Sequence, residues 1–155
     1  MRDAVAAYIG VGANLGDAAG AVREAIARIA ELPQTTLERH SSLYRTAPVE
    51  SSGPDYINAV AQVCTRLAAP ELLAQLQTLE QAAGRERPYR NAPRTLDLDL
   101  LLFGDGRIDS ARLQVPHPRM NTRAFVLVPL AEIAPQLVAP AQLAAVAQQR
   151  LERLA

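Results

Sequence analysis

The spacing of hydrophobic and polar positions changes several times along the chain, and each spacing predicts one kind of element. A short apolar run over residues 5–11 predicts a buried strand, and the glycine-containing stretch 12–17 predicts a tight turn after it. Apolar residues recur at helical intervals over 18–31, until Pro33 ends the helix. Residues 37–44 show a period of two and predict a partly exposed strand.

The middle of the chain predicts the same order of elements again, a strand followed by a helix and another strand. Residues 56–65 have strand character, and a stripe of leucines after Pro70 predicts a helix that ends at Gly84. An arginine-rich loop covers 85–94. The alternation and apolar run of residues 95–103 then predict a further strand.

This order of elements indicates a fold class. Strand, helix, strand, strand, helix, strand predicts an α+β fold with a ferredoxin-like βαββαβ core, in which helices pack on the faces of an antiparallel sheet. A helical pattern over about 122–133 and an Ala- and Leu-rich stretch after Pro140 predict a C-terminal helical extension. No repeat or linker interrupts the sequence, so we expect residues 1–155 to form a single domain.

The composition excludes several classes of function. Sixteen basic residues balance sixteen acidic ones, so the overall charge gives no reason to expect binding to nucleic acid or to a membrane surface. Every basic residue is Arg, which excludes a Schiff-base lysine and a P-loop lysine. The one cysteine, Cys64, cannot form an internal disulfide, and we expect it to pack in the core. The N-terminal pattern fits neither a signal peptide nor a spanning helix, so we expect a cytoplasmic protein.

Two aspartates form the sharpest candidate for chemistry. On a strand, Asp97 and Asp99 point to the same face, while the leucines between and beside them point into the core. Paired carboxylates suit Mg²⁺, which completes its coordination shell with water and substrate phosphates. A strand with a solvated acidic face explains the same short pattern.

The loop before these aspartates is strongly basic. Four arginines and one glutamate give residues 85–94 a net charge of +3 within a chain whose charges cancel. Guanidinium groups make forked hydrogen bonds to phosphate oxygens, although an arginine-rich loop can also be a solvated turn. Beside the aspartate pair, the loop favours phosphoryl or pyrophosphoryl transfer, in which the protein aligns the reactants and stabilises charge.

Two further features could bind a ligand. Tyr56 and Asn58 share a face of a predicted strand, where a ring and an amide suit a flat heterocycle, and core packing is the alternative. His117 lies between two prolines and close to Arg119 and Arg123, so a ligand-binding role and a structural role are both open.

Taken in order, these segments resemble the 6-hydroxymethyl-7,8-dihydropterin pyrophosphokinase family of folate biosynthesis. The resemblance covers nearly the whole chain and rests on residues 8–17, 41–48, 55–59, 93–104 and 115–120. It implies transfer of pyrophosphate from MgATP to the hydroxymethyl group of 6-hydroxymethyl-7,8-dihydropterin, with release of AMP. We expect a monomer whose partners are these two small molecules, and neither nucleic acid nor membrane.

The resemblance also implies roles for individual residues. Asp97 and Asp99 would hold two Mg²⁺ ions that bridge the ATP phosphates, with Asp97 assisting the substrate hydroxyl. The residues with implied catalytic roles are Asp97, Asp99, Arg85, Arg87, Arg90 and Arg94. The positions implied to contact ATP are Gln77, Glu80, Arg85, Arg94, Leu98, Arg112, Gln114, His117 and Arg123. The positions implied to contact the pterin are Thr46, Val49, Tyr56, Asn58 and Phe125, with the pterin stacked between the two rings.

One loop position departs from the family pattern. Arg87 and Arg90 would belong to a catalytic loop that closes over the site, and Asn91 stands where well-known members carry Trp. The aromatic lid is then missing or supplied by Tyr89. We expect this loop and residues 49–55 to close when both substrates bind.

Two other classes of function remain open at this stage. A non-catalytic small-ligand domain of the same fold would explain the pair Tyr56 and Asn58 but gives the acidic pair no purpose. An RNA-binding module would explain the arginine loop, but zero net charge and 4% aromatic residues argue against it. Formation of AMP rather than ADP from MgATP and the reduced pterin distinguishes the enzyme from both.

Overall fold

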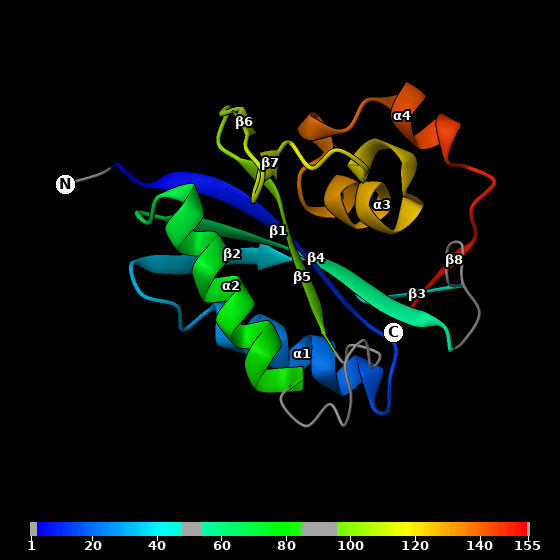
Figure 1. Ribbon diagram of the computed structural model, residues 1–155. Coiled ribbons are helices and arrows are strands. Elements are labelled where there is room, and N and C mark those ends of the chain that lie inside the picture. The colour runs from blue at the N-terminus through cyan, green and yellow to red at the C-terminus, as the bar shows by residue number, and fades with distance from the viewer. Residues whose placement is uncertain (1–2, 48–53, 85–95, 155) are drawn as a thin grey trace.

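The computed structural model describes residues 3–47, 54–84 and 96–154, and its centre is a six-stranded antiparallel sheet (Figure 1). The strands follow the spatial order β5-β1-β4-β3-β8. Strand β2 pairs with the same edge of β4 as β3 does, at the other end of β4. The strands of this sheet are β1 (Val5–Ala13), β2 (Thr35–His40), β3 (Tyr44–Thr46), β4 (Tyr56–Thr65), β5 (Asp97–Phe103) and β8 (Leu151–Arg153).

Helices cover both faces of the sheet. Helices α1 (Ala18–Ile29) and α2 (Ala69–Gly84) pack on one face, and α3 (Ala124–Ile133) packs on the other (Figure 1). The shorter elements are the hairpin β6 (Ile108–Asp109) and β7 (Gln114–Val115), the 3₁₀ turns η1 (Met120–Thr122) and η2 (Pro135–Leu137), and α4 (Pro140–Ala145). Among the described helices, none is long and apolar enough to cross a membrane.

The alternation along β1 divides the interior into two cores. Ile9 and Val11 pack against α1 and α2, whereas Tyr8 packs with Val60 and Leu101 against α3. On the α3 face, the row of Gly12, Asn58 and Asp97 follows these apolar residues further along the same strands, so the face becomes polar there. The polar part of this face forms the site described below.

The predicted α+β fold is confirmed. The order β1, α1, the divided strand β2 and β3, β4, α2 and β5 reproduces the expected βαββαβ sequence, and the described strand pairs are antiparallel. The strand expected over 37–44 is divided in two at Ser41. Ser41 Oγ accepts a hydrogen bond from Val60 N at 2.9 Å and donates to Ser42 O at 2.7 Å. A side chain that replaces backbone partners in this way interrupts the ladder.

The C-terminal extension is only partly helical. Helix α4 covers six residues, and the chain then returns to the sheet as β8, which pairs with β3. Leu154 N donates to Leu43 O at 2.8 Å beyond this strand. The helix predicted after Pro140 does begin there but is shorter than expected, because pairing with a strand that is distant in the sequence leaves no mark in the local pattern.

Two smaller expectations also need correction. Cys64 is only half-buried, because its position on β4 faces the part of the sheet that α3 does not cover. Strand β1 continues to Ala13, so Gly12 belongs to the strand and the turn begins later than expected.

Candidate active site

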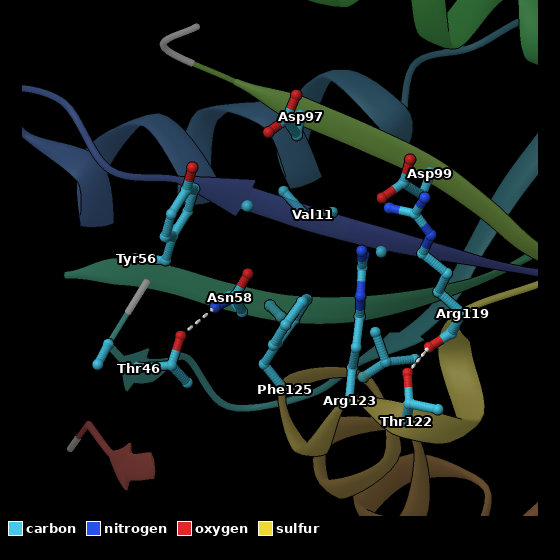
Figure 2. Close-up of a pocket in the computed structure, with 15 residues that line it drawn as sticks. Val11, Thr46, Tyr56, Asn58, Asp97, Asp99, Arg119, Thr122, Arg123 and Phe125 are labelled. Atoms are coloured by element: carbon cyan, nitrogen blue, oxygen red, sulfur yellow. Dashed lines mark hydrogen bonds between the residues drawn. The ribbon is translucent and has the colours of Figure 1, made fainter. Parts of the chain in front are cut away.

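A cavity of about 720 Å³ opens on the α3 face of the sheet (Figure 2). Strands β1, β3, β4 and β5 line it together with η1 and the start of α3, and it is bordered by both acidic and basic side chains. The polar and aromatic residues that line it are Thr46, Tyr56, Asn58, Asp97, Asp99, Arg119, Thr122, Arg123 and Phe125.

Glycines form the floor of this cavity. Gly12 on β1 lies between Asn58 on β4 and Asp97 on β5, and Gly10 lies beside Asp99. Cross-strand partners share a face of the sheet, so these two positions leave space where other residues would place side chains. A Cβ added at Gly12 would lie 2.7 Å from Asn58 Oδ1, a distance that real contacts essentially never show.

An oriented amide lies between two aromatic rings. Asn58 is buried, and its Nδ2 donates a hydrogen bond to Thr46 Oγ1 at 2.9 Å. Tyr56 comes from β4 and Phe125 from α3, and both are half-buried at the cavity wall (Figure 2). Two rings from different elements and a fixed amide can hold a planar heterocycle and recognise its edge.

The acidic pair lies on a strand, as the sequence predicted, and this strand, β5, is at the edge of the described sheet. Asp97 is half-buried and Asp99 is exposed, and both line the cavity. The intervening Leu98 is buried in the core, and its backbone N donates to Glu80 Oε2 on α2 at 2.7 Å. Glu80 therefore anchors the strand between the two aspartates, while the alternation along β5 directs both carboxylates to the cavity.

Positive charge faces this pair from the start of α3. The Arg123 guanidinium lies over the Phe125 ring, with Cζ 5.4 Å from the ring centroid. Figure 2 shows Arg119 and Arg123 extending from this side of the cavity toward the strands, and Thr122 Oγ1 donates to Arg119 O at 3.0 Å. Opposite charges on the two walls suit a ligand that carries phosphates together with a metal ion.

His117 lies close to both kinds of charge. Burial lowers the pKa of His117 below 6.5, Arg123 and Arg119 lower it further, and Asp99 opposes them. His117 Nδ1 accepts a hydrogen bond from Arg119 N at 3.1 Å. The imidazole is therefore neutral near pH 7 and carries its proton on Nε2, which makes Nε2 a hydrogen-bond donor.

A second cavity of about 390 Å³ adjoins the first, and Asp99 lines both. This second cavity collects four of the positions expected to contact ATP, namely Leu98, Arg112, Gln114 and His117. Arg123 lines the first cavity instead. Gln77 is exposed on α2 and lines neither cavity, and Glu80 acts through Leu98.

Several expected site residues lie outside the described part of the chain. They are Val49, Arg85, Arg87, Arg90 and Arg94, together with Tyr89 and Asn91. Their roles, and the closing of the two loops, stay predictions.

Some cavity residues were not expected from the sequence. Gly12 was interpreted as part of a turn, and Arg119 was noticed only as positive charge near His117. The available signals were the alternation of glycines with apolar residues at the end of β1, and the spacing of four between Arg119 and Arg123. Neither signal by itself distinguishes a site from an ordinary strand or helix.

The donor set fits Mg²⁺ bound together with a nucleotide. Within residues 3–47, 54–84 and 96–154, no group of three or more His, Cys, Asp or Glu side chains could enclose a metal ion. Two carboxylates on one strand face leave the remaining coordination positions to water and phosphate oxygens, which is the arrangement that Mg²⁺ prefers in nucleotide-using enzymes.

Comparison with known proteins agrees with this geometry. The family model described as 7,8-dihydro-6-hydroxymethylpterin-pyrophosphokinase (HPPK) matches residues 8–135. A 2-amino-4-hydroxy-6-hydroxymethyldihydropteridine pyrophosphokinase from Synechocystis sp. is 46% identical over 134 residues, which cover 86% of this chain and 69% of that protein. The Haemophilus influenzae protein of the same name is 44% identical over 88% of this chain and 86% of its own length. The chain belongs to the HPPK family, a family of pyrophosphokinases, and the resemblance seen in the sequence is confirmed.

A solved structure shows the same fold at low sequence identity. The Plasmodium falciparum HPPK-DHPS structure with pterin and p-hydroxybenzoate matches 87% of this chain with a TM-score of 0.67 at 14% identity. This chain spans 40% of that longer chain. The match supports the architecture of the α+β fold.

Proposed function

We propose that this chain transfers pyrophosphate from MgATP to the hydroxymethyl group of 6-hydroxymethyl-7,8-dihydropterin, a step of folate biosynthesis. The products are AMP and the dihydropterin diphosphate. The substrate hydroxyl oxygen bonds to the β-phosphorus, and the bond from that phosphorus to the oxygen bridging to the α-phosphate breaks. The observation that carries the proposal is one cavity that joins the acidic pair Asp97 and Asp99 to the ring-and-amide group of Tyr56, Asn58 and Phe125.

The ring-and-amide group would bind the pterin. The ring of the pterin stacks between Tyr56 and Phe125, while Asn58 and the backbone near Thr46 and Val49 contact its polar edge. Support for the orientation of Asn58 comes from its hydrogen bond to Thr46 and from the close approach of Gly12. The hydroxymethyl group then points along the cavity toward β5 because the aspartates form the far wall.

The acidic pair would hold the metal and the attacking hydroxyl. Asp97 and Asp99 are the proposed ligands of Mg²⁺, two ions as the family resemblance implies, and the bound metal neutralises charge on the phosphates. Asp97 is the half-buried member of the pair and shares a cross-strand row with Asn58. We therefore propose that Asp97 accepts the proton of the substrate hydroxyl. A carboxylate that accepts this proton raises the nucleophilicity of the oxygen.

The cations would bind the phosphate chain. Arg123 and Arg119 carry positive charge, and His117 would donate from Nε2 because its Nδ1 already accepts from Arg119 N. The nucleotide would extend into the second cavity past Leu98, Arg112 and Gln114. Asp99 would then lie where the triphosphate passes between the two cavities, because it lines both of them.

The proposal covers residues 1–155 as one catalytic unit that acts as a monomer in the cytoplasm, where ATP is supplied. Residues of one chain supply the acidic pair, the rings and the cations of the described cavity, which supports this proposal. Sedimentation of the active protein at assay concentration would check the monomer.

The deciding experiment is identification of the nucleotide product. The protein is incubated with MgATP and the reduced pterin, and the nucleotides are separated by chromatography. The expected result is AMP and pterin diphosphate in equal amounts, with neither formed when the pterin or Mg²⁺ is left out. Release of ADP, or AMP formation that is independent of the pterin, would contradict the proposal.

A further inference from the structure

Gln149 bridges the backbone on both sides of Arg123. It lies in the segment between α4 and β8, beyond the residues that the family model matches. Its Oε1 accepts a hydrogen bond from Ala124 N at 2.9 Å, and its Nε2 donates to Thr122 O at 2.9 Å. One side-chain amide therefore contacts the peptide group before Arg123 and the peptide group after it.

Gln149 supplies a capping hydrogen bond that the N-cap residue of α3 does not make. Arg123 is the N-cap of α3, its side chain makes no capping hydrogen bond, and its backbone is extended at φ −125° and ψ 113°. The first N–H groups of a helix have no partner within the helix, and Ser, Thr, Asp or Asn usually supplies one from the N-cap position. Here Gln149 caps the helix from 25 residues away, which leaves the Arg123 side chain available to the cavity.

The junction held in this way carries two site residues. Arg123 and Phe125 both line the larger cavity, and the guanidinium lies over the ring. A rotation about the backbone of Arg123 would move the cation on the phosphate side and the ring on the pterin side together. The bridging amide therefore restrains the backbone that carries both groups.

The segment that carries Gln149 is itself anchored on both sides. Gln149 N donates to Val146 O at 3.0 Å, and Val146 is buried against α3. Beyond Gln149, Leu151 pairs with Thr46 in the sheet. An amide held between a buried residue and a strand can act as a fixed support rather than as a mobile surface group.

We propose that Gln149 is a positioning residue, which fixes Arg123 and Phe125 in the geometry that binds both substrates. The proposal rests on the proposed function, because it assigns the two residues to the nucleotide phosphates and to the pterin. Gln149 itself lines neither of the two described cavities. Its effect is to pre-organise two groups that line the larger one.

The test compares Gln149→Met, Gln149→Glu and the control Gln148→Met. Methionine keeps the length and volume of glutamine and removes both hydrogen bonds, whereas glutamate keeps the acceptor for Ala124 N and loses the donor to Thr122 O. Gln148 is exposed beside Gln149, so its variant controls for a methionine on this surface. Steady-state kinetics of AMP formation are measured for both substrates at a temperature well below the melting temperature of each variant.

We expect Gln149→Met to raise KM for both ATP and the pterin and to lower kcat/KM by about tenfold to a hundredfold, the cost of a small misplacement of binding groups. Gln149→Glu should lose less, and Gln148→Met should match the unchanged protein. A loss of activity that follows only the unfolded fraction, measured by circular dichroism, would indicate a purely structural role and overturn the proposal. If Gln149→Met does not fold, Gln149→Glu provides the same kinetic test through the lost bond to Thr122.

Two outcomes separate this inference from the function beneath it. Unchanged protein that forms no AMP contradicts the proposed function. If the unchanged protein forms AMP and the kcat/KM of Gln149→Met lies within twofold of its value for both substrates, only the role of Gln149 is contradicted.

Discussion

Asn58 Nδ2 donates a hydrogen bond to Thr46 Oγ1 at a distance of 2.9 Å, and the two residues come from neighbouring strands β4 and β3. This bond leaves Asn58 Oδ1 against the backbone of Gly12. The amide is thus oriented before any ligand arrives, and a ligand edge meets a fixed pattern of donor and acceptor groups. Orientation of a polar group in advance lowers the entropic cost of binding.

Replacement of Thr46 tests this orientation. Thr46→Val keeps the shape of the side chain and removes the hydroxyl, so Asn58 loses its partner. A neutral hydrogen bond contributes about 0.5–1.5 kcal/mol, and we expect pterin affinity to fall by roughly two- to tenfold with ATP affinity unchanged. Thr46→Ser keeps the hydroxyl and serves as the matched control. Titration calorimetry with the pterin checks the result, and equal affinities of the two variants would argue against the orienting bond.

Replacement of either aspartate tests the acidic pair. Asp97→Asn and Asp99→Asn remove charge and weaken Mg²⁺ ligation, and we expect AMP formation to fall by about two or more orders of magnitude. Asp105→Asn, in the exposed turn after β5, is the control and should remain active. Melting temperatures of all three variants check the fold. Near-normal activity of both site variants would show that the strand carries only a solvated acidic face.

The regular elements of this fold could be predicted because their signals are local. The leucines around Asp97 and Asp99 are buried as the alternation predicted, and both aspartates reach the cavity. The period of two also placed Tyr56 and Asn58 on one wall. These features depend on spacing within a single strand, which the sequence displays directly.

Other features depend on residues that are distant in the sequence. Strand β8 pairs with β3 across the fold, and Gln149 caps a helix that starts 25 residues before it. Gly12 matters only because Asn58 lies beside it in the sheet. Local spacing contains no information on such partners, so the cap, the extra strand and the open floor could be recognised only in the structure.

Removal of either ring tests the proposed pterin slot. Tyr56→Ala and Phe125→Ala each remove one stacking surface, and by analogy with base stacking we expect pterin binding to weaken by about 1–3 kcal/mol. ATP affinity should change little for Tyr56→Ala. Phe125 also lies under the Arg123 guanidinium, so the change in ATP affinity of Phe125→Ala measures the effect of that contact. Equal losses for ATP and pterin with Tyr56→Ala would show that this ring does not belong to the pterin slot.

A polar network on the far side of α3 connects three elements. Glu132 on α3 accepts hydrogen bonds from Tyr44 OH at 2.6 Å and Ser42 Oγ at 2.9 Å, and Arg153 Nη2 on β8 lies 3.7 Å from it. Burial raises the pKa of Glu132, but these hydrogen bonds and the Arg153 charge together lower it below 4.5. The charged carboxylate is therefore the form that the folded state favours.

Acid should weaken this network in a defined window. A pKa lowered on folding contributes stability that is present above about pH 4.5 and is lost as the pH falls through the folded value. Because Glu132 is exposed to solvent, we expect Glu132→Gln to lower the free energy of unfolding by only about 0.5–1 kcal/mol at pH 7, and the difference to shrink toward pH 3. Thermal melts across this range measure it. Glu24→Gln, which removes an exposed pair with Arg28, is the control, and a pH-independent gap for Glu132→Gln would contradict the linkage.

Alkaline pH should lower the stability of the protein by ionising Tyr44, the hydrogen-bond partner of Glu132. Burial, together with the hydrogen bond to Glu132 and the nearby Glu132 charge, raises the pKa of Tyr44 to about 12 from 10.0, against the opposing charge of Arg153. A raised pKa contributes stability that is fully present below pH 10 and is lost as the pH rises toward 12. Tyr44→Phe cannot ionise and should lose less stability between pH 9 and about 11 than the unchanged protein. Tyr56→Phe, a substitution of a tyrosine outside this network, is the control. Denaturant melts at these pH values supply the measurement, and parallel losses in Tyr44→Phe and the unchanged protein would show that Tyr44 does not carry the alkaline transition.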